Sequence, residues 1–133
     1  MASIFTKIIQ RSIPSYKVAE SEYFYAFLDI NPLAKGHTLV VPKKEIDYIF
    51  DLDEQTYSGL MHFSKNVAAA IKEVMPCKRI GVAVIGLEVP HAHLHLVPIN
   101  NVQDLNFASP KLTIEKEELI SISDLISSAY NLL

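Results

Sequence analysis

The strongest constraint on the fold is the segment from Pro90 to Ile99, in which polar and apolar residues alternate strictly. The polar members are His91, His93 and His95, and the residues between them are alanine and leucine. Successive side chains of a β-strand point to opposite faces, so this spacing predicts a strand with one imidazole face and one core face. At roughly 3.3 Å rise per residue, neighbouring imidazoles would lie about 6.5–7 Å apart, close enough to act together on one chemical group.

Three interpretations of these histidines follow from the residue types. A strand can carry histidines on its wet face without any function. The imidazoles can also bind a metal ion, in which case the partner ligand would be His37, Glu88 or Asp29. In the third interpretation a neutral imidazole attacks phosphorus, while its neighbours bind the phosphoryl oxygens or protonate the leaving group.

Further runs of the chain are typical of β-strands. Residues 22–28 are aromatic and strand-like, residues 37–41 form a second run closed by Pro42, and the two are predicted to pair as antiparallel strands. Residues 79–87 form a short β-run in which Gly86 indicates a turn or bulge.

Helical spacing of apolar residues appears in three places. A short helix is predicted at residues 4–9 and is stopped by Pro14, and a weaker amphipathic helix is predicted at residues 115–133. The longest helix begins near Asp51 or Asp53, either of which can cap it, and ends at Pro76. Its expected apolar stripe is Tyr57, Leu60, Met61, Ser64, Val67, Ala68, Ile71 and Val74. We therefore expect one α+β domain over residues 1–133, with an antiparallel sheet of about five strands, one long helix, and short N-terminal and C-terminal helices.

Composition excludes several classes of function. With 133 residues, half of them hydrophobic, the chain can bury one core. The net charge is −3 and there is no cluster of basic residues of the kind that binds phosphate backbones, so no nucleic-acid partner is expected. Cys77 is the only cysteine, which excludes an intramolecular disulfide and suits a reducing compartment. Lys7 and Arg11 interrupt the first apolar run, and no stretch reaches the roughly 18 apolar residues of a membrane span. We expect a cytoplasmic protein with no membrane partner.

Three ordered segments resemble the histidine-triad (HIT) superfamily, in particular its Hint branch and bacterial relatives. Residues 91–97 fit the pattern His-φ-His-φ-His-φ-φ that defines this superfamily. Residues 3–9 (SIFTKII) resemble its opening helix, and residues 27–43 (FLDINPLAKGHTLVVPK) resemble its F-x-D-I-x-P…G-H-x-L-V-I-P-K segment. The resemblance covers residues 3–99 and leaves residues 100–133 as a C-terminal extension.

The resemblance implies a nucleotide-binding enzyme that splits a nucleoside monophosphate from an amine or phosphate leaving group. It implies that His93 is the nucleophile, that His95 contacts the phosphate oxygens, that His91 supports the relay and that His37 lies against the triad. It implies that Asp29 holds the ribose hydroxyls, a role that competes with a simple turn-forming one. The apolar walls of the base pocket implied by the resemblance, otherwise ordinary core residues, are Ile4, Phe5, Ile8, Phe27 and Ile30.

Two departures from the family pattern bear on the chemistry. Many bacterial relatives carry a C-x-x-C pair that helps to bind a structural zinc, and those positions here correspond to Ser3 and Thr6, so we expect no such site. The glycine-rich phosphate loop before the triad is several residues shorter, with Leu87 and Glu88 at its end. A carboxylate beside the site would disfavour a phosphate anion and could raise the pKa of His91 or His95.

The sequence thus predicts a purine nucleotide-binding hydrolase that cleaves phosphoramidates or related nucleotidyl bonds through a nucleotidyl-histidine, with no cofactor and no catalytic metal. The alternatives are a dinucleoside polyphosphate hydrolase and a nucleotide-binding or partner-binding module with little turnover. The resemblance also implies a homodimer joined through the sheets and long helices, and the small residues of the long helix offer a seam that equally fits packing on its own sheet. Those seam residues are Met61, Val67, Ala68, Ala69 and Ala70.

Overall fold

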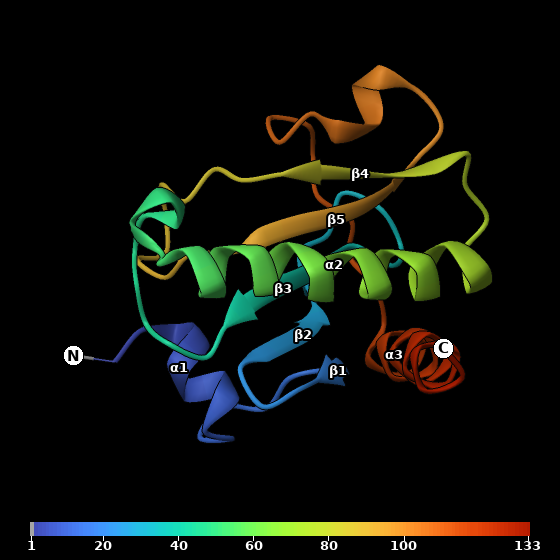
Figure 1. The fold of residues 1–133 in the computed structure, drawn as a ribbon. Helices are drawn as coiled ribbons and strands as arrows, with labels where there is room; N and C mark the ends of the chain where they lie inside the picture. The colour runs from blue at the N-terminus through green and yellow to red at the C-terminus, as the bar shows by residue number, and fades with distance from the viewer. Residues whose placement is uncertain (1) are drawn as a thin grey trace.

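A five-stranded antiparallel sheet organises the molecule in the computed structural model, which describes residues 2–133. In spatial order its strands are β1 (Lys17–Glu20), β2 (Phe24–Leu28), β3 (Thr38–Pro42), β5 (Leu94–Ile99) and β4 (Arg79–Ala83). Every neighbouring pair is antiparallel, including the predicted pairing of β2 with β3. The expected α+β class and the size of the sheet are confirmed (Figure 1).

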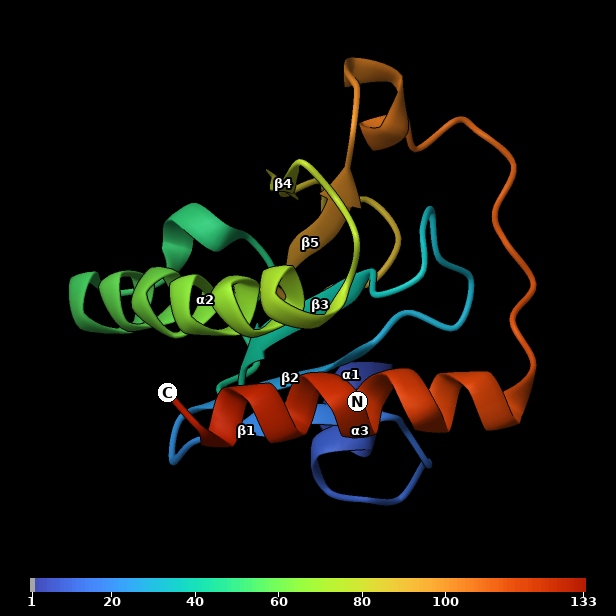
Figure 2. The ribbon, with the colours of Figure 1, turned by 90° about the vertical axis from the view of Figure 1, so that its right-hand side faces the viewer.

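Helices cover both faces of this sheet. The helices α2 (Glu54–Val74) and α3 (Lys116–Asn131) pack on one face, where they share a core with inward residues of β2, β3 and β5. The short helix α1 (Ile4–Ile9) lies on the opposite face, as Figures 1 and 2 show. Two 3₁₀ turns, η1 (Ile49–Asp51) and η2 (Val102–Leu105), complete the elements. Within residues 2–133, no helix has the length and apolar character needed to cross a membrane.

The long helix α2 begins at the predicted cap. Asp53 accepts a hydrogen bond from the Thr56 backbone N–H at 2.7 Å, which satisfies one of the free donors at the helix start. The expected stripe was partly wrong. Met61, which it included, is 42% exposed, whereas Phe63 and Ala70, which it omitted, are buried. The fully buried face follows i, i+3, i+4 spacing and consists of Leu60, Phe63, Ser64, Val67, Ala70 and Ile71.

Two other elements differ from expectation. α1 ends at Ile9, well before Pro14, because Arg11 adopts a left-handed conformation (φ 65°) and the Ser12 N–H donates to the Lys7 carbonyl at 2.9 Å. This is a Schellman ending, which normally favours glycine at the left-handed position. Strand β1 was not predicted, because four residues with no alternation give no strand signal.

The histidine segment is a strand only in its second half. β5 begins at Leu94, and the backbone before it bonds elsewhere: the His91 N–H donates to Val89 O, and the Ala92 N–H donates to Ile46 O at 2.7 Å. Pro90 has no N–H to contribute to a ladder. The alternation of side chains persists across this stretch, since Ala92 and Leu94 enter the core beneath α2 while the histidines face the other side.

Candidate active site

The sheet register gathers the predicted residues on the α1 face. Phe27 on β2 pairs with Leu39 on β3, and Leu39 pairs with His95 on β5, so these three side chains form a row across the sheet. Asp29 and His37 lie two residues from Phe27 and Leu39 respectively, and therefore face the same side. The Asp29 N–H donates to the His37 carbonyl at 3.0 Å, which joins the two chain segments at the sheet end.

His37 and His95 form a hydrogen-bonded pair with a defined proton position. The Leu33 backbone N–H donates to His37 Nδ1 at 3.0 Å, so that nitrogen carries no proton. In neutral His37 the proton is on Nε2, which donates to His95 Nδ1 at 3.0 Å. Neutral His95 then carries its own proton on Nε2, where it is available as a donor to a ligand.

A second chain of hydrogen bonds fixes His91 and His93. His91 Nε2 donates to the Pro42 carbonyl at 2.7 Å, and its Nδ1 accepts from the Ser3 hydroxyl, also at 2.7 Å. The carbonyl of His91 accepts from His93 Nδ1 at 2.7 Å. With its proton held on Nδ1, neutral His93 keeps a lone pair on Nε2, the nitrogen that could attack an electrophile.

Four aromatic rings stand in a row along the site. The centroids of Phe5 and His93 are 4.9 Å apart, those of His93 and His95 are 5.1 Å apart, and those of His95 and Phe107 are 4.6 Å apart. All three contacts have the edge-to-face geometry that aromatic rings favour. The row brings the histidines closer together than the spacing of an ideal strand predicts.

Burial lowers the pKa of three histidines. Loss of hydration lowers the pKa of His37 to about 3 and that of His95 to about 4, and it also lowers the pKa of His91. The expectation that the carboxylate of Glu88 raises the pKa of His91 or His95 was therefore wrong; Glu45 opposes the fall at His91 through its charge, but burial outweighs it. At neutral pH these rings are uncharged, so His95 can donate a hydrogen bond but holds no second proton to act as an acid.

The predicted pocket residues divide into buried and open positions. Phe5, Ile8 and Phe27 are buried in the cluster between α1 and the sheet. Ile4 and Ile30 are 49% and 59% exposed, so they are not ordinary core residues. Large apolar side chains left open beside a buried aromatic cluster are the usual lining of a ligand site.

Asp29 is half-buried at the edge of the site. Its Oδ1 accepts from the Asn31 N–H at 2.8 Å, and its Oδ2 lies 3.7 Å from His37 Nε2. Burial raises the pKa of Asp29, and the charge of Lys111 opposes that rise while the charge of Glu88 adds to it. This carboxylate can serve both roles considered from the sequence. Oδ1 forms the turn through Asn31, and Oδ2, which accepts no hydrogen bond from residues 2–133, can bind a ligand.

A polar network on His91 was not predicted as part of the site. The Ser3 hydroxyl caps α1 by accepting from the Thr6 N–H at 3.0 Å, and the Ser3 N–H donates to Glu45 at 2.7 Å. Thr6 Oγ1 donates to the same Glu45 oxygen. A serine before an apolar helix is a capping signal, but no local pattern indicated that it would reach His91. Neutral hydroxyls are not the thiolates that hold structural zinc, and Ser3 already occupies His91 Nδ1, so this donor set does not fit that metal.

Asp29, His37 and His95 present ligand atoms within 4.8 Å of one another, a spacing that fits a metal ion. This set corresponds to the metal interpretation considered from the sequence, in which Asp29 or His37 is the partner ligand to a triad histidine. The hydrogen bonds nevertheless oppose a metal: His37 Nε2 bears the proton, and moving it to Nδ1 would set it against the Leu33 N–H. The three ligand atoms are close enough to bind one metal ion, but His37 Nε2 carries a proton and therefore offers no lone pair to it.

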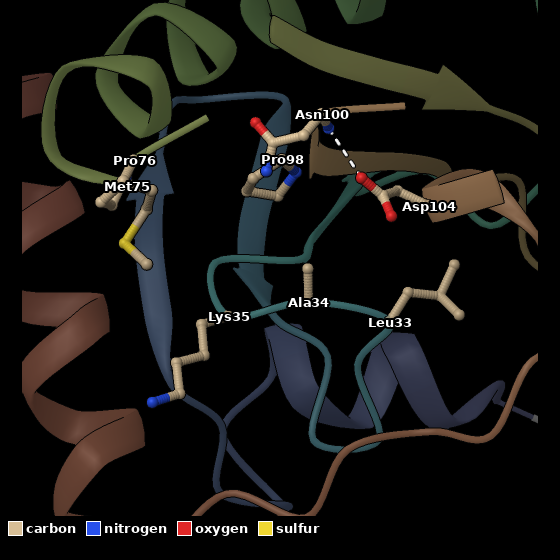
Figure 3. Close-up of a pocket in the computed structure, with 8 residues that line it drawn as sticks. All are labelled: Leu33, Ala34, Lys35, Met75, Pro76, Pro98, Asn100 and Asp104. Atoms are coloured by element: carbon tan, nitrogen blue, oxygen red, sulfur yellow. Dashed lines mark hydrogen bonds between the residues drawn. The ribbon is translucent and has the colours of Figure 1, made fainter. Parts of the chain in front are cut away.

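A surface hollow of about 330 Å³ lies apart from the histidines, and none of them lines it (Figure 3). It is bordered by the loop at Leu33 to Lys35, the end of α2 and the end of β5. Its charged groups already have partners, because Lys35 pairs with Glu118 at 2.6 Å and Asp104 accepts from the Asn100 N–H at 2.7 Å. No unsatisfied group on this hollow points to a ligand.

Fold and site together define an α+β protein that carries a multi-histidine centre on the helix-poor face of its sheet. Residues 10–102 match the family model of the HIT domain. The adenosine 5'-monophosphoramidase HNT1 of Saccharomyces cerevisiae is 39% identical over 98 residues, which are 73% of this chain and 62% of that protein. The adenosine 5'-monophosphoramidase hnt1 of Schizosaccharomyces pombe is 33% identical over 130 residues, covering 96% of this chain and 98% of that protein.

A solved structure gives the same assignment. A zinc-bound histidine triad family protein from Mycobacterium smegmatis superposes with a TM-score of 0.84 at 27% identity, covering 99% of this chain and 95% of that chain. The chain belongs to the histidine triad (HIT) family.

Proposed function

We propose that this protein binds a purine nucleotide and hydrolyses nucleoside phosphoramidates or related nucleotidyl bonds. The observation that carries the proposal is the position of the protons: among the four site histidines, His93 alone has a ring nitrogen, Nε2, that is both unpartnered within residues 2–133 and unprotonated, whereas the free Nε2 of His95 carries a proton. The phosphoramidase names of the two yeast relatives support the choice of reaction.

The proposed reaction has two steps. The Nε2 lone pair of His93 attacks phosphorus, the P–N bond breaks, and the departing nitrogen takes up one proton from solvent to leave as an amine. Water then attacks phosphorus and gives up one proton to solvent, the bond between phosphorus and Nε2 breaks, and the mononucleotide leaves, which restores the lone pair on His93. His95 donates its Nε2–H to the phosphoryl oxygens in both steps, and the Pro42 and Ser3 contacts of His91 keep the His93 tautomer in place.

The pocket residues have separate roles in this proposal. Ile4, Phe5, Ile8, Phe27 and Ile30 contact the base, and the carboxylate of Asp29 accepts hydrogen bonds from the ribose hydroxyls. Glu88 is exposed at the end of the short loop before His91, where its negative charge would weaken binding of highly charged polyphosphates. This charge favours a phosphoramidate over a dinucleoside polyphosphate.

The test compares turnover of an adenosine phosphoramidate with that of a diadenosine polyphosphate, each with and without a chelator. We expect faster turnover of the phosphoramidate and no loss with chelator. Faster cleavage of the polyphosphate would select the alternative hydrolase, and nucleotide binding without turnover of either would select the binding module. Loss of activity on chelation that zinc restores would contradict the metal-independent mechanism.

We also propose a cytoplasmic homodimer. Strand β4 is an edge of the sheet, and its neighbourhood exposes the apolar side chains of Val82, Val84 and Ile85. An unpaired edge with exposed apolar residues favours pairing with a second copy. Of the expected helix seam, Val67 and Ala70 are buried in the protein's own core, whereas Met61 remains exposed.

A further inference from the structure

Residues 106–112 belong to no helix or strand, and no site residue was predicted among them. They connect η2 to α3 and, as Figure 2 shows, pass beside the loop between β2 and β3. The Leu112 N–H donates to the Pro32 carbonyl at 2.8 Å, which ties this segment to the loop that carries Asp29 and His37. Within the segment, the Ser109 N–H donates to Asn106 O at 3.0 Å, and Lys111 donates to two carbonyls.

The half-buried side chain of Phe107 is the part of this segment that reaches the histidines. Its ring centroid is 4.6 Å from that of His95 and 6.0 Å from that of His37, and both contacts are edge-to-face. His37 is 1% exposed, and its Nε2 meets only protein atoms, His95 Nδ1 at 3.0 Å and Asp29 Oδ2 at 3.7 Å, so the surrounding side chains exclude water from it. Phe107 is the aromatic side chain that contacts both members of the pair from outside the triad.

We propose that residues 106–112 form a wall of the active site and that Phe107 is a positioning residue, which excludes water from the His37–His95 pair and orients the His95 ring. The inference rests on the proposed function only in assigning His95 to the phosphoryl oxygens. The imidazole pair that Phe107 is proposed to shield from water is present in the protein without substrate, so its titration can be measured there.

The charged and titratable groups around the pair come from three segments. Asp29 lies on the loop after β2, His93 precedes β5, and Lys111 lies on the 106–112 segment itself. Burial lowers the pKa of His37 most, followed by the charges of His95 and Lys111, whereas burial and the charge of His93 lower the pKa of His95. Phe107→Ala removes the wall and Lys111→Met removes the charge, so the two variants separate the two causes.

The experiment is an NMR titration of the imidazole resonances in the free, full-length protein. In Phe107→Ala the pKa of His95 should rise by about one unit or more, because water reaches the ring. Phe107→Tyr, which keeps the ring, should restore the low value, and Lys111→Met should leave His95 unchanged. Val102→Ala, at an 87% exposed position in η2, is the matched control and should also leave it unchanged.

Kinetics give a second readout. Phe107→Ala should lower kcat by about tenfold, with little change in KM, and should move the acid limb of the pH profile upward. If Phe107→Ala does not fold, Phe107→Leu decides the question, since a smaller apolar side chain should still raise the pKa of His95 measurably. An unchanged pKa of His95 in the folded variant overturns the proposal, whether or not the protein turns over a phosphoramidate. A raised pKa in a protein without turnover supports the wall and contradicts only the proposed function.

Discussion

At the scale of single residues, the state of each imidazole is set by a specific hydrogen-bond partner, which lies 49 and 88 residues away for His91 but only two residues away for His93 and four for His37. A Pro42 carbonyl and a Ser3 hydroxyl fix His91, the His91 carbonyl fixes His93, and a Leu33 N–H fixes the partner of His95. The sequence predicted which histidines matter, because their period of two is visible in one segment. It could not predict these partners, because backbone carbonyls and amides carry no sequence signal and their encounter depends on the completed fold.

The ribose role of Asp29 is testable at this scale. Asp29→Asn removes the ionised acceptor and should raise KM about tenfold while changing kcat much less, because the lost contact is remote from phosphorus. A 2'-deoxyribose substrate should then be used as well as the ribose one. The measurement is steady-state kinetics on both substrates, with Asp124→Asn on the exposed face of α3 as the control. An unchanged preference for ribose in Asp29→Asn would assign this carboxylate to the turn alone.

At the scale of elements, periodicity located the strands and helices that carry the site but not the irregular segments that complete it. The alternation around His93 predicted the correct faces, although hydrogen bonds to Val89 and Ile46 replace the ladder before Leu94. The 3.6-residue stripe of α2 was correct in direction and wrong at Met61, because one side of the helix is left uncovered. Phe107 was missed since the segment around it has no period, and its position depends on where η2 and α3 lie.

The turn before His37 gives a prediction about an element boundary. Gly36 has a φ of +94°, and an added Cβ would lie 2.9 Å from Met75 Cγ and 3.3 Å from Pro98 Cγ. Gly36→Ala should therefore lower the free energy of unfolding by about 1–3 kcal/mol and reduce turnover by displacing His37. Gly86→Ala is the matched control, since Gly86 also has a positive φ (+72°) but no atom within 4 Å of the added Cβ.

Chemical denaturation of both variants measures this difference. The loss of stability in Gly86→Ala should be the smaller one, because it reflects backbone conformation without a steric clash. Equal losses in the two variants would show that packing against Met75 and Pro98 contributes nothing.

At the scale of the whole molecule, the fold class was predictable because the apolar patterns of the helices and strands require helices packed on a sheet. The order of the strands in the sheet and the existence of β1 were not predictable. The order β1-β2-β3-β5-β4 arises from long-range pairing, for which the sequence offers no local cue. The same packing makes stability depend on pH. His37 and His95 are buried as neutral rings, so at mildly acidic pH the folded state binds fewer protons than the unfolded chain does.

The sign of this dependence follows from the lowered pKa values. The pKa of His37 is about 3 and that of His95 about 4 in the folded state, against about 6.5 when unfolded. Their contribution is complete above about pH 6.5 and declines as the pH falls, by up to about 1.4 kcal/mol per pH unit for each histidine. Urea unfolding from pH 4 to 8 measures the slope. His37→Asn should reduce it, whereas replacing the exposed His62 by Gln should not, and identical slopes in all three proteins would contradict the buried neutral pair.

The proposed dimer is a second prediction at this scale. Ile85→Lys places a charge on the exposed apolar surface beside β4 and should shift the protein to the monomeric mass, because burying an unpaired charge at an interface is costly. Analytical ultracentrifugation at micromolar concentration provides the measurement, and Leu132→Lys at the exposed C-terminal end is the control. A wild-type protein that sediments as a monomer would remove the dimer from the account.

The most direct test of the central claim is to trap and locate the nucleotidyl intermediate. Wild-type protein is mixed with an adenosine phosphoramidate, quenched on the millisecond scale under mildly alkaline conditions that preserve a phosphorus–nitrogen bond, and digested for mass spectrometry. The hydrogen bonds that leave Nε2 of His93 free predict one adenylyl group on His93, and they predict that His93→Ala loses the adduct and several orders of magnitude of kcat. An adduct on His91 or His95, or undiminished turnover by His93→Ala, would contradict the assignment of His93 as the nucleophile.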